Sequence, residues 1–143
     1  MNYFNELGNA IAQIDGAVEH WIVKLGLTYN HFAVLYSLAD NADGTTQKQI
    51  CDEWYIPKQT IFNICKEYKE KGLLEFYPSA TDKREKIMRL TDAGRAVAEP
   101  ILAKTHDISK QVFAEFGTEK TAQLFALMHE FSVIFNQKVA THD

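Results

Sequence analysis

The sequence predicts a mainly α-helical protein that carries one small β-hairpin. Apolar residues recur at spacings of three and four near both ends and through much of the middle, which is typical of helices that bury one face. Between residues 73 and 90 this pattern gives way to two short strand-like runs, of which the second alternates polar and apolar residues, separated by the turn-forming segment Pro78-Ser79-Ala80-Thr81-Asp82. We therefore expect six helices and one hairpin.

The first two helices are defined by their apolar faces and by the residues at their ends. The first runs from about Phe4 to Leu25 and ends at Gly26. Thr28 is a suitable N-cap for the second, because its hydroxyl can accept a free amide of the first turn. The apolar face of that helix consists of Phe32, Leu35 and Leu38, and a turn follows at 41–44.

The middle of the chain predicts two shorter helices followed by the hairpin. Thr46 caps a third helix that reaches about Trp54. Pro57 fits the first turn of a fourth helix, where its missing N–H costs nothing, and that helix runs to Lys71 with Gly72 after it. The strands are expected at 73–77 and 86–90.

The C-terminal part predicts two long helices. Thr91 caps a helix from Asp92 to Phe116, in which we expect Pro100 to introduce a kink. Gly117 ends it, and Thr118 caps the last helix. The last helix carries its apolar side chains on one face, at Leu124, Leu127, Met128, Phe131, Ile134 and Phe135.

Residues 47–66 match the pattern of a helix-turn-helix. Such a unit needs apolar side chains where its two helices face each other and the core, and here these places hold Ile50, Trp54, Ile56, Ile61 and Ile64. A small residue is needed where the helices cross, and Cys51 occupies that place. Tyr55 departs from the pattern, because its place in the turn is often glycine. Together with the hairpin, this predicts a winged helix-turn-helix.

The outer face of the fourth helix and the tip of the hairpin carry groups that suit DNA. Gln and Asn can pair with adenine edges and Thr with either base edge, whereas Lys suits phosphates. The residues expected to bind DNA on the helix are Lys58, Gln59, Thr60, Asn63 and Lys66. In the wing they are Asp82, Lys83, Arg84 and Lys86, where Asp82 is expected to hold Arg84 by a carboxylate–guanidinium pair.

The charge distribution permits DNA binding although the chain is acidic overall. The net charge is −4, but residues 46–95 contain ten Lys or Arg and eight Asp or Glu, so this window carries +2. Phosphates respond to the local field within about 8–10 Å. The chain has no run of eighteen apolar residues, no signal-peptide pattern and only two cysteines. We therefore expect a cytoplasmic protein that is not inserted in a membrane.

The same segments resemble the MarR family of regulators. The resemblance rests on Leu27-Thr28, Phe32, Val34-Leu35, Thr46-Gln47, Ile50 and Lys71-Gly72-Leu73-Leu74, and most strongly on Asp82-Lys83-Arg84 followed by Leu90-Thr91-Asp92-Ala93-Gly94-Arg95. It covers about residues 10–135. Two departures stand out: many members carry Arg near the place of Asn63, and Phe62 is large for that surface. We expect Phe62 to pack towards the helix-turn-helix core or the second strand.

The resemblance implies a homodimer that binds a palindromic operator in double-stranded DNA and represses nearby genes. Residues 28–91 would form the DNA-binding domain, and residues 1–27 and 92–143 a helical dimerisation region. Arg84 would enter the minor groove with Asp82 as its support. The many aromatic residues of the terminal helices agree with a shared interface, although a larger monomeric bundle is the alternative.

The resemblance also implies a pocket for a small effector near the first two helices and the start of the fifth. Six residues there would suit an aromatic acid, although packing is the simpler interpretation of each: His20, Trp21, Lys24, Tyr29, His31 and Tyr36. Cys51 and Cys65 raise a redox-responsive version, but both fit core positions. The five histidines lack metal-site spacing, so a metal-responsive version has little support.

The sequence favours no enzyme and no cofactor. It lacks the nucleophile-elbow, P-loop, dinucleotide-binding and zinc-protease motifs. The alternative to a DNA-binding regulator is a winged-helix module that binds another protein. The cations Lys83, Arg84 and Lys86 argue against that alternative.

Overall fold

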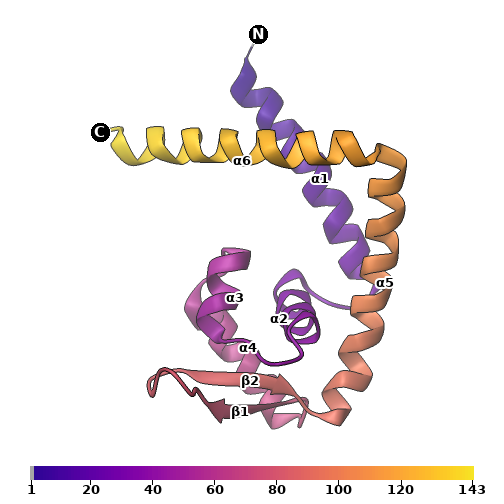
Figure 1. Ribbon diagram of the computed structural model, residues 1–143, viewed down its shortest axis with the longest axis vertical. Coiled ribbons are helices and arrows are strands. Elements are labelled where there is room, and N and C mark those ends of the chain that lie inside the picture. The colour runs from indigo at the N-terminus through magenta and orange to yellow at the C-terminus, as the bar shows by residue number, and fades with distance from the viewer. Residues whose placement is uncertain (1) are drawn as a thin grey trace. The chain divides into compact units, whose positions relative to one another are not determined.

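The computed structural model describes residues 2–143 and places six helices and one two-stranded hairpin in them (Figure 1). The chain forms two compact units, Met1–Leu102 and Ala103–Asp143, and the boundary falls within one long helix. Each unit is therefore described by itself. Within residues 2–143, no helix combines the length and the apolar character that a membrane span requires.

The first unit begins with α1 (Tyr3–Lys24) and α2 (Tyr29–Asp40), close to the predicted bounds. The side chain of Asn2 accepts the amide of Asn5 at the start of α1. After α1, Gly26 adopts a left-handed φ of 77°, which turns the chain towards α2. Thr28 caps α2 as predicted, since its Oγ1 accepts the amide of His31.

The helix-turn-helix consists of α3 (Gln47–Trp54) and α4 (Lys58–Glu70), both packed against α2 (Figure 1). Thr46 caps α3 by accepting the amide of Gln49 at 3.0 Å. The predicted core places are confirmed: Ile50, Ile56, Ile61 and Ile64 are buried, and Trp54 lies against the edge of the same cluster. Completely burying one such Ile stabilises the fold by roughly 1.5–3 kcal/mol.

The turn between these helices shows why glycine is often found at the place of Tyr55. Its backbone is left-handed, with φ 53° and ψ 43°, a conformation that glycine adopts without a steric penalty. The side chain is 93% exposed, so the phenol contributes little packing in return. Pro57 lies one place earlier than predicted: it is the N-cap of α4, with ψ 142°, and not its first helical residue.

The hairpin pairs β1 (Leu74–Pro78) with β2 (Lys86–Leu90) in antiparallel register, from Leu74 opposite Leu90 to Pro78 opposite Lys86. β1 begins one residue later than expected, because the amide of Leu73 still bonds to the carbonyl of Tyr68 and closes the end of α4. Thr45 extends the pairing by exchanging two backbone hydrogen bonds with Met88, at 3.1 and 2.8 Å. The wing is therefore attached to the loop before α3.

The hairpin is joined closely to the following helix, α5 (Asp92–Phe116). The Thr91 hydroxyl accepts the amide of Gly94 at 3.0 Å, which confirms the predicted cap, and donates to the carbonyl of Gly72 at 2.6 Å. A Cβ built on Gly94 would lie 1.9 Å from the carbonyl oxygen of Leu73. Pro100 lies inside α5, which is one uninterrupted helix.

The second unit contains the end of α5 and α6 (Thr118–Thr141). Gly117, with φ 106°, separates the two helices and is itself the N-cap of α6. Thr118 was expected to be that cap, and this was wrong, because Thr118 is already the first helical residue and no side-chain cap bond forms. The ring centres of Phe113 and Phe125 are 5.6 Å apart, yet no residue of α6 is buried.

Candidate nucleic-acid interface

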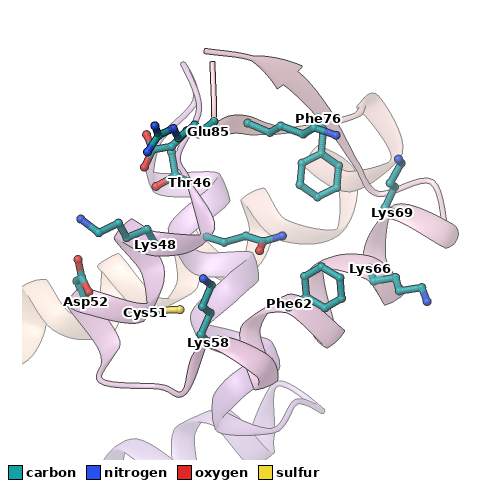
Figure 2. A pocket seen from close by; sticks show the side chains of 13 residues that line it. Thr46, Lys48, Cys51, Asp52, Lys58, Phe62, Lys66, Lys69, Phe76 and Glu85 are labelled. Carbon is teal, nitrogen blue, oxygen red and sulfur yellow. The ribbon is translucent and has the colours of Figure 1, made fainter. Parts of the chain in front are cut away.

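A groove of about 730 Å³ opens between α3, α4 and the hairpin, and we call it the basic groove (Figure 2). Six of its lining residues are cationic and two are acidic, Asp52 and Glu85. The cationic residues are Lys48, Lys58, Lys66, Lys69, Arg84 and Lys86. Positive charge therefore gathers at this one site on a chain whose net charge is −4.

One row of α4 side chains forms a wall of the basic groove. Lys58, Phe62, Lys66 and Lys69 follow each other at helical spacings of four, four and three, so they share a face. Figure 2 shows Lys58, Phe62 and Lys66 in sequence along the helix. Lys58 and Lys66, both predicted to bind DNA, thus line the basic groove.

Gln59 and Asn63 are exposed beside this row and are joined to each other. The Gln59 side-chain amide donates to Asn63 Oδ1 at 3.0 Å. The Gln59 side-chain oxygen and the Asn63 side-chain nitrogen are not used in this bond, and they are the kinds of acceptor and donor that pair with an adenine edge. Thr60, predicted on the same outer face, is half-buried, and so it is less available than these two.

Glu67 of α4 makes its side-chain contacts outside the basic groove. Its carboxylate lies 3.2 Å from Nε2 of His31 and 3.4 Å from the ammonium of Lys71. The other nitrogen of His31 lies 2.7 Å from the Thr28 hydroxyl, and its ring packs edge-on against Tyr68 at 5.6 Å. His31 therefore ties the start of α2 to the C-terminal part of α4.

The wing tip is held by backbone hydrogen bonds, which corrects one expectation. Asp82 Oδ1 accepts the backbone amide of Arg84 at 2.9 Å, and the Ser79 hydroxyl accepts the amides of Thr81 and Asp82. No Asp82–Arg84 ion pair forms among residues 2–143. The carboxylate shapes the turn because it reaches the near amide, and the guanidinium is left exposed.

The wing cations are divided between the groove and the tip. Arg84 and Lys86 are exposed and line the basic groove, whereas Lys83 is exposed outside its lining. At the other end of β2, the Arg89 guanidinium donates to the carbonyl of Asp43 at 2.9 Å and lies over the Tyr77 ring. Arg89 therefore anchors the hairpin to the loop before α3.

Several residues of the groove were not predicted from the sequence. Lys48 stands in the first turn of α3, and only the packing of α3 on α4 brings it to the same space. Lys69 lies with its ammonium 5.3 Å from the centre of the Phe76 ring, and its spacing from Lys58 was a signal that could have identified it. Phe62 was expected to pack inwards, and this was wrong: it is 48% exposed and lines the groove.

The six residues predicted for an effector pocket lie on α1 and α2, and their role in a pocket stays a prediction. Tyr29 and Tyr36 pack edge-on against Trp54, with ring centres 5.8 and 5.9 Å apart, and Phe32 completes this aromatic cluster. His31 faces α4. His20, Trp21 and Lys24 lie on α1, where His20 and Lys24 are exposed. None of the six lines the basic groove.

The cysteines have the character of core thiols. Burial raises the pKa of the Cys65 thiol to about 12. Burial, together with the neighbouring Asp52, also raises the pKa of Cys51, which is half-buried at the rim of the groove. A raised pKa lowers the thiolate fraction on which oxidation depends. Across residues 2–143, no three His, Cys, Asp or Glu side chains gather as a metal site would require.

Comparison with known proteins agrees with this architecture. A family model described as MarR family matches residues 25–85. A MarR family regulator from Neisseria meningitidis is 36% identical, each chain covers 98% of the other, and the TM-score is 0.89. The chain therefore belongs to the MarR family and has its winged helix-turn-helix fold.

Two further relatives resemble the chain at lower sequence identity. An HTH-type transcriptional regulator, Hpr, from Shouchella clausii is 28% identical over 112 residues, which are 78% of this chain and 56% of the relative. The chain thus spans about half the length of the curated relatives that it matches. A mutant MarR from E. coli, solved with operator DNA, shares the fold at 22% identity and a TM-score of 0.66, over 91% of this chain and 99% of that one.

Proposed function

We propose that this protein is a transcriptional regulator that binds double-stranded DNA sequence-specifically and performs no catalysis. The observation that carries the proposal is the basic groove, where six cations from α3, α4 and the wing surround one space. α4 lies in the major groove, with Gln59 and Asn63 on base edges and Lys58 and Lys66 on phosphates. The wing brings Arg84 to the adjacent minor groove.

We also propose that two copies act together on a palindromic operator as a repressor. α6 leaves a row of apolar side chains exposed, among them Phe125, Met128, Phe131 and Ile134, each at least 50% accessible. α1 does the same at Tyr3 and Phe4. A second copy of the chain is the partner that we expect to cover these apolar surfaces, and paired half-sites follow from a two-fold dimer.

A small effector that lowers DNA affinity is the remaining part of this proposal. The contacts of α2 support it: Tyr29 and Tyr36 pack on Trp54 of α3, and His31 bonds to Glu67 of α4. A ligand that displaces these side chains would shift α3 and α4 relative to the wing. Thermal unfolding with and without aromatic acids tests this step, because a ligand of the native protein raises its melting temperature.

The DNA-binding proposal is tested by titrating the protein with duplexes selected from a random pool and with the DNA upstream of its gene, at several salt concentrations. Lys66→Ala should weaken binding to every sequence and reduce the slope of log affinity against log salt by about one, because one phosphate contact is lost. Lys110→Ala is the matched control, since Lys110 is an exposed lysine of α5 outside the groove.

The outcomes separate clearly. Binding that is weakened by Lys66→Ala and unaffected by Lys110→Ala supports the groove as the DNA site. Equal effects of the two substitutions would show that binding depends on overall charge. No selectable DNA at low salt would reject the function.

A further inference from the structure

Phe62 is an apolar side chain in the centre of a charged surface. It lies midway along the α4 wall of the basic groove, with Lys58 one turn before it and Lys66 one turn after it. Figure 2 shows the Phe62 ring at the groove, and Phe76 of β1 lines the same space from the hairpin. About half of the Phe62 side chain, 48%, remains exposed.

The chemistry of a phenyl ring restricts what it can recognise there. The ring offers no hydrogen-bond donor and no acceptor to a base edge. In the major groove, thymine is the base that presents a methyl group, at C5, whereas the other bases present donors and acceptors. In the proposed complex, α4 lies in the major groove of the DNA and the Phe62 ring lies between the two lysines that bind phosphates. The apolar group available to the ring there is a thymine methyl.

The neighbouring amides favour the same kind of base pair. Gln59 and Asn63, joined by their 3.0 Å hydrogen bond, are exposed on the adjacent strip of α4. Asn and Gln side chains match the donor and acceptor of adenine. Adenine and thymine are partners in one base pair. The two amides and the Phe62 ring are therefore all suited to A·T pairs.

We propose that Phe62 is a specificity-determining residue that reads a thymine methyl group in each operator half-site. This inference rests on the proposed DNA-binding function and deepens it by assigning the base chemistry at one position. Lys58 and Lys66 fix the helix on the phosphates, and Phe62 then discriminates by excluding water from the methyl group.

The test compares thymine with deoxyuridine, which differs only by the missing methyl. A preferred operator is selected from a random pool with the full chain, and each thymine is replaced in turn. Wild-type protein should lose about three- to fivefold in affinity at one thymine of each half-site, the effect of one lost apolar methyl contact. In Phe62→Ala the thymine-to-deoxyuridine ratio at that position should fall to about one.

Three controls make the result specific. Phe62→Leu keeps an apolar side chain and should retain most of the ratio. Lys66→Ala should weaken both duplexes by the same factor and leave the ratio unchanged. Circular dichroism on heating verifies that Phe62→Ala is folded, which its half-exposed position favours.

Two results would overturn the inference while leaving DNA binding intact: deoxyuridine without effect at every thymine, or a ratio that persists in Phe62→Ala. An operator that lacks thymine in its half-sites would overturn it as well. Failure of the wild-type protein to select any DNA rejects the proposed function, and the inference with it.

Discussion

Gly94 shows how a single residue sets the position of the wing. It lies in the first turn of α5, where an added Cβ would be 1.9 Å from the Leu73 carbonyl oxygen and 3.0 Å from a Leu90 methyl. Leu73 directly precedes β1 and Leu90 ends β2, and the Thr91 hydroxyl after β2 donates to the carbonyl of Gly72 before β1. The absence of a side chain therefore allows helix and hairpin to touch.

Gly94→Ala should lower the free energy of unfolding by about 2–4 kcal/mol, because backbone has to move to accommodate the methyl group. Gly16→Ala in α1 is the control: an added Cβ meets nothing within 4 Å there, and alanine should stabilise the helix by about 0.5–1 kcal/mol. Urea unfolding followed by circular dichroism measures both. A Gly94→Ala variant as stable as the wild type would contradict the close approach.

At the scale of the element, the wing is a short hairpin whose geometry depends on local hydrogen bonds. Its strands pair over five positions, and Thr45 adds a bridge to Met88. Its tip relies on the Ser79 hydroxyl and the Asp82 carboxylate, both of which accept backbone amides. This arrangement holds Arg84 exposed without neutralising it.

Asp82→Asn and Asp82→Ala distinguish this role from the ion pair that the sequence suggested. Asparagine keeps a side-chain oxygen that can accept the Arg84 amide, whereas alanine loses it. We expect Asp82→Ala to weaken DNA binding about three- to tenfold, the effect of losing about 0.5–1.5 kcal/mol of hydrogen bonding in the turn. Asp82→Asn should stay within about twofold of the wild type.

Fluorescence anisotropy at fixed salt compares the two Asp82 variants with Arg84→Ala. If the asparagine variant were as weak as the alanine variant, the negative charge of Asp82 and not its position in the turn would be the important property.

At the scale of the whole molecule, the apolar surface and the basic groove belong to different parts of the chain. The groove is confined to the first unit, whereas α6 of the second unit has no buried residue and many apolar ones. Exposed apolar area of this kind is unusual for a monomer. A shared interface of terminal helices would bury it and would place two DNA-binding lobes in one particle.

Phe131→Glu should convert the proposed dimer to a monomer at micromolar concentration, because it places a charge within the proposed interface. The side chain is 50% exposed in the single chain, so the substitution spares the fold of each unit. Gln123→Glu, a charge change at an exposed polar place on the same helix, is the control. Sedimentation velocity gives the assembly state, and a wild-type monomer would refute the dimer.

Much of this molecule is determined locally by its sequence. Thr28, Thr46 and Thr91 cap helices because a hydroxyl next to free amides suffices, and Ile50, Ile56, Ile61 and Ile64 are buried because their spacing admits one core face. Glycines at 26, 72 and 117 take the positive φ at which these helices end. Motif and spacing were enough for the fold, and they also singled out Lys58 and Arg84, which line the basic groove. That Gln59 and Asn63 bind DNA stays a prediction.

Only the tertiary structure decided the rest, because it depends on which faces meet. Lys48 joins the groove through the packing of α3 on α4, and Asp82 bonds to a backbone amide because that group is nearer than the guanidinium. Because Phe62 is apolar, the sequence predicted that it would pack inwards. The core beneath α4 is already filled by Ile61, Ile64 and Cys65, and the ring is left facing the groove.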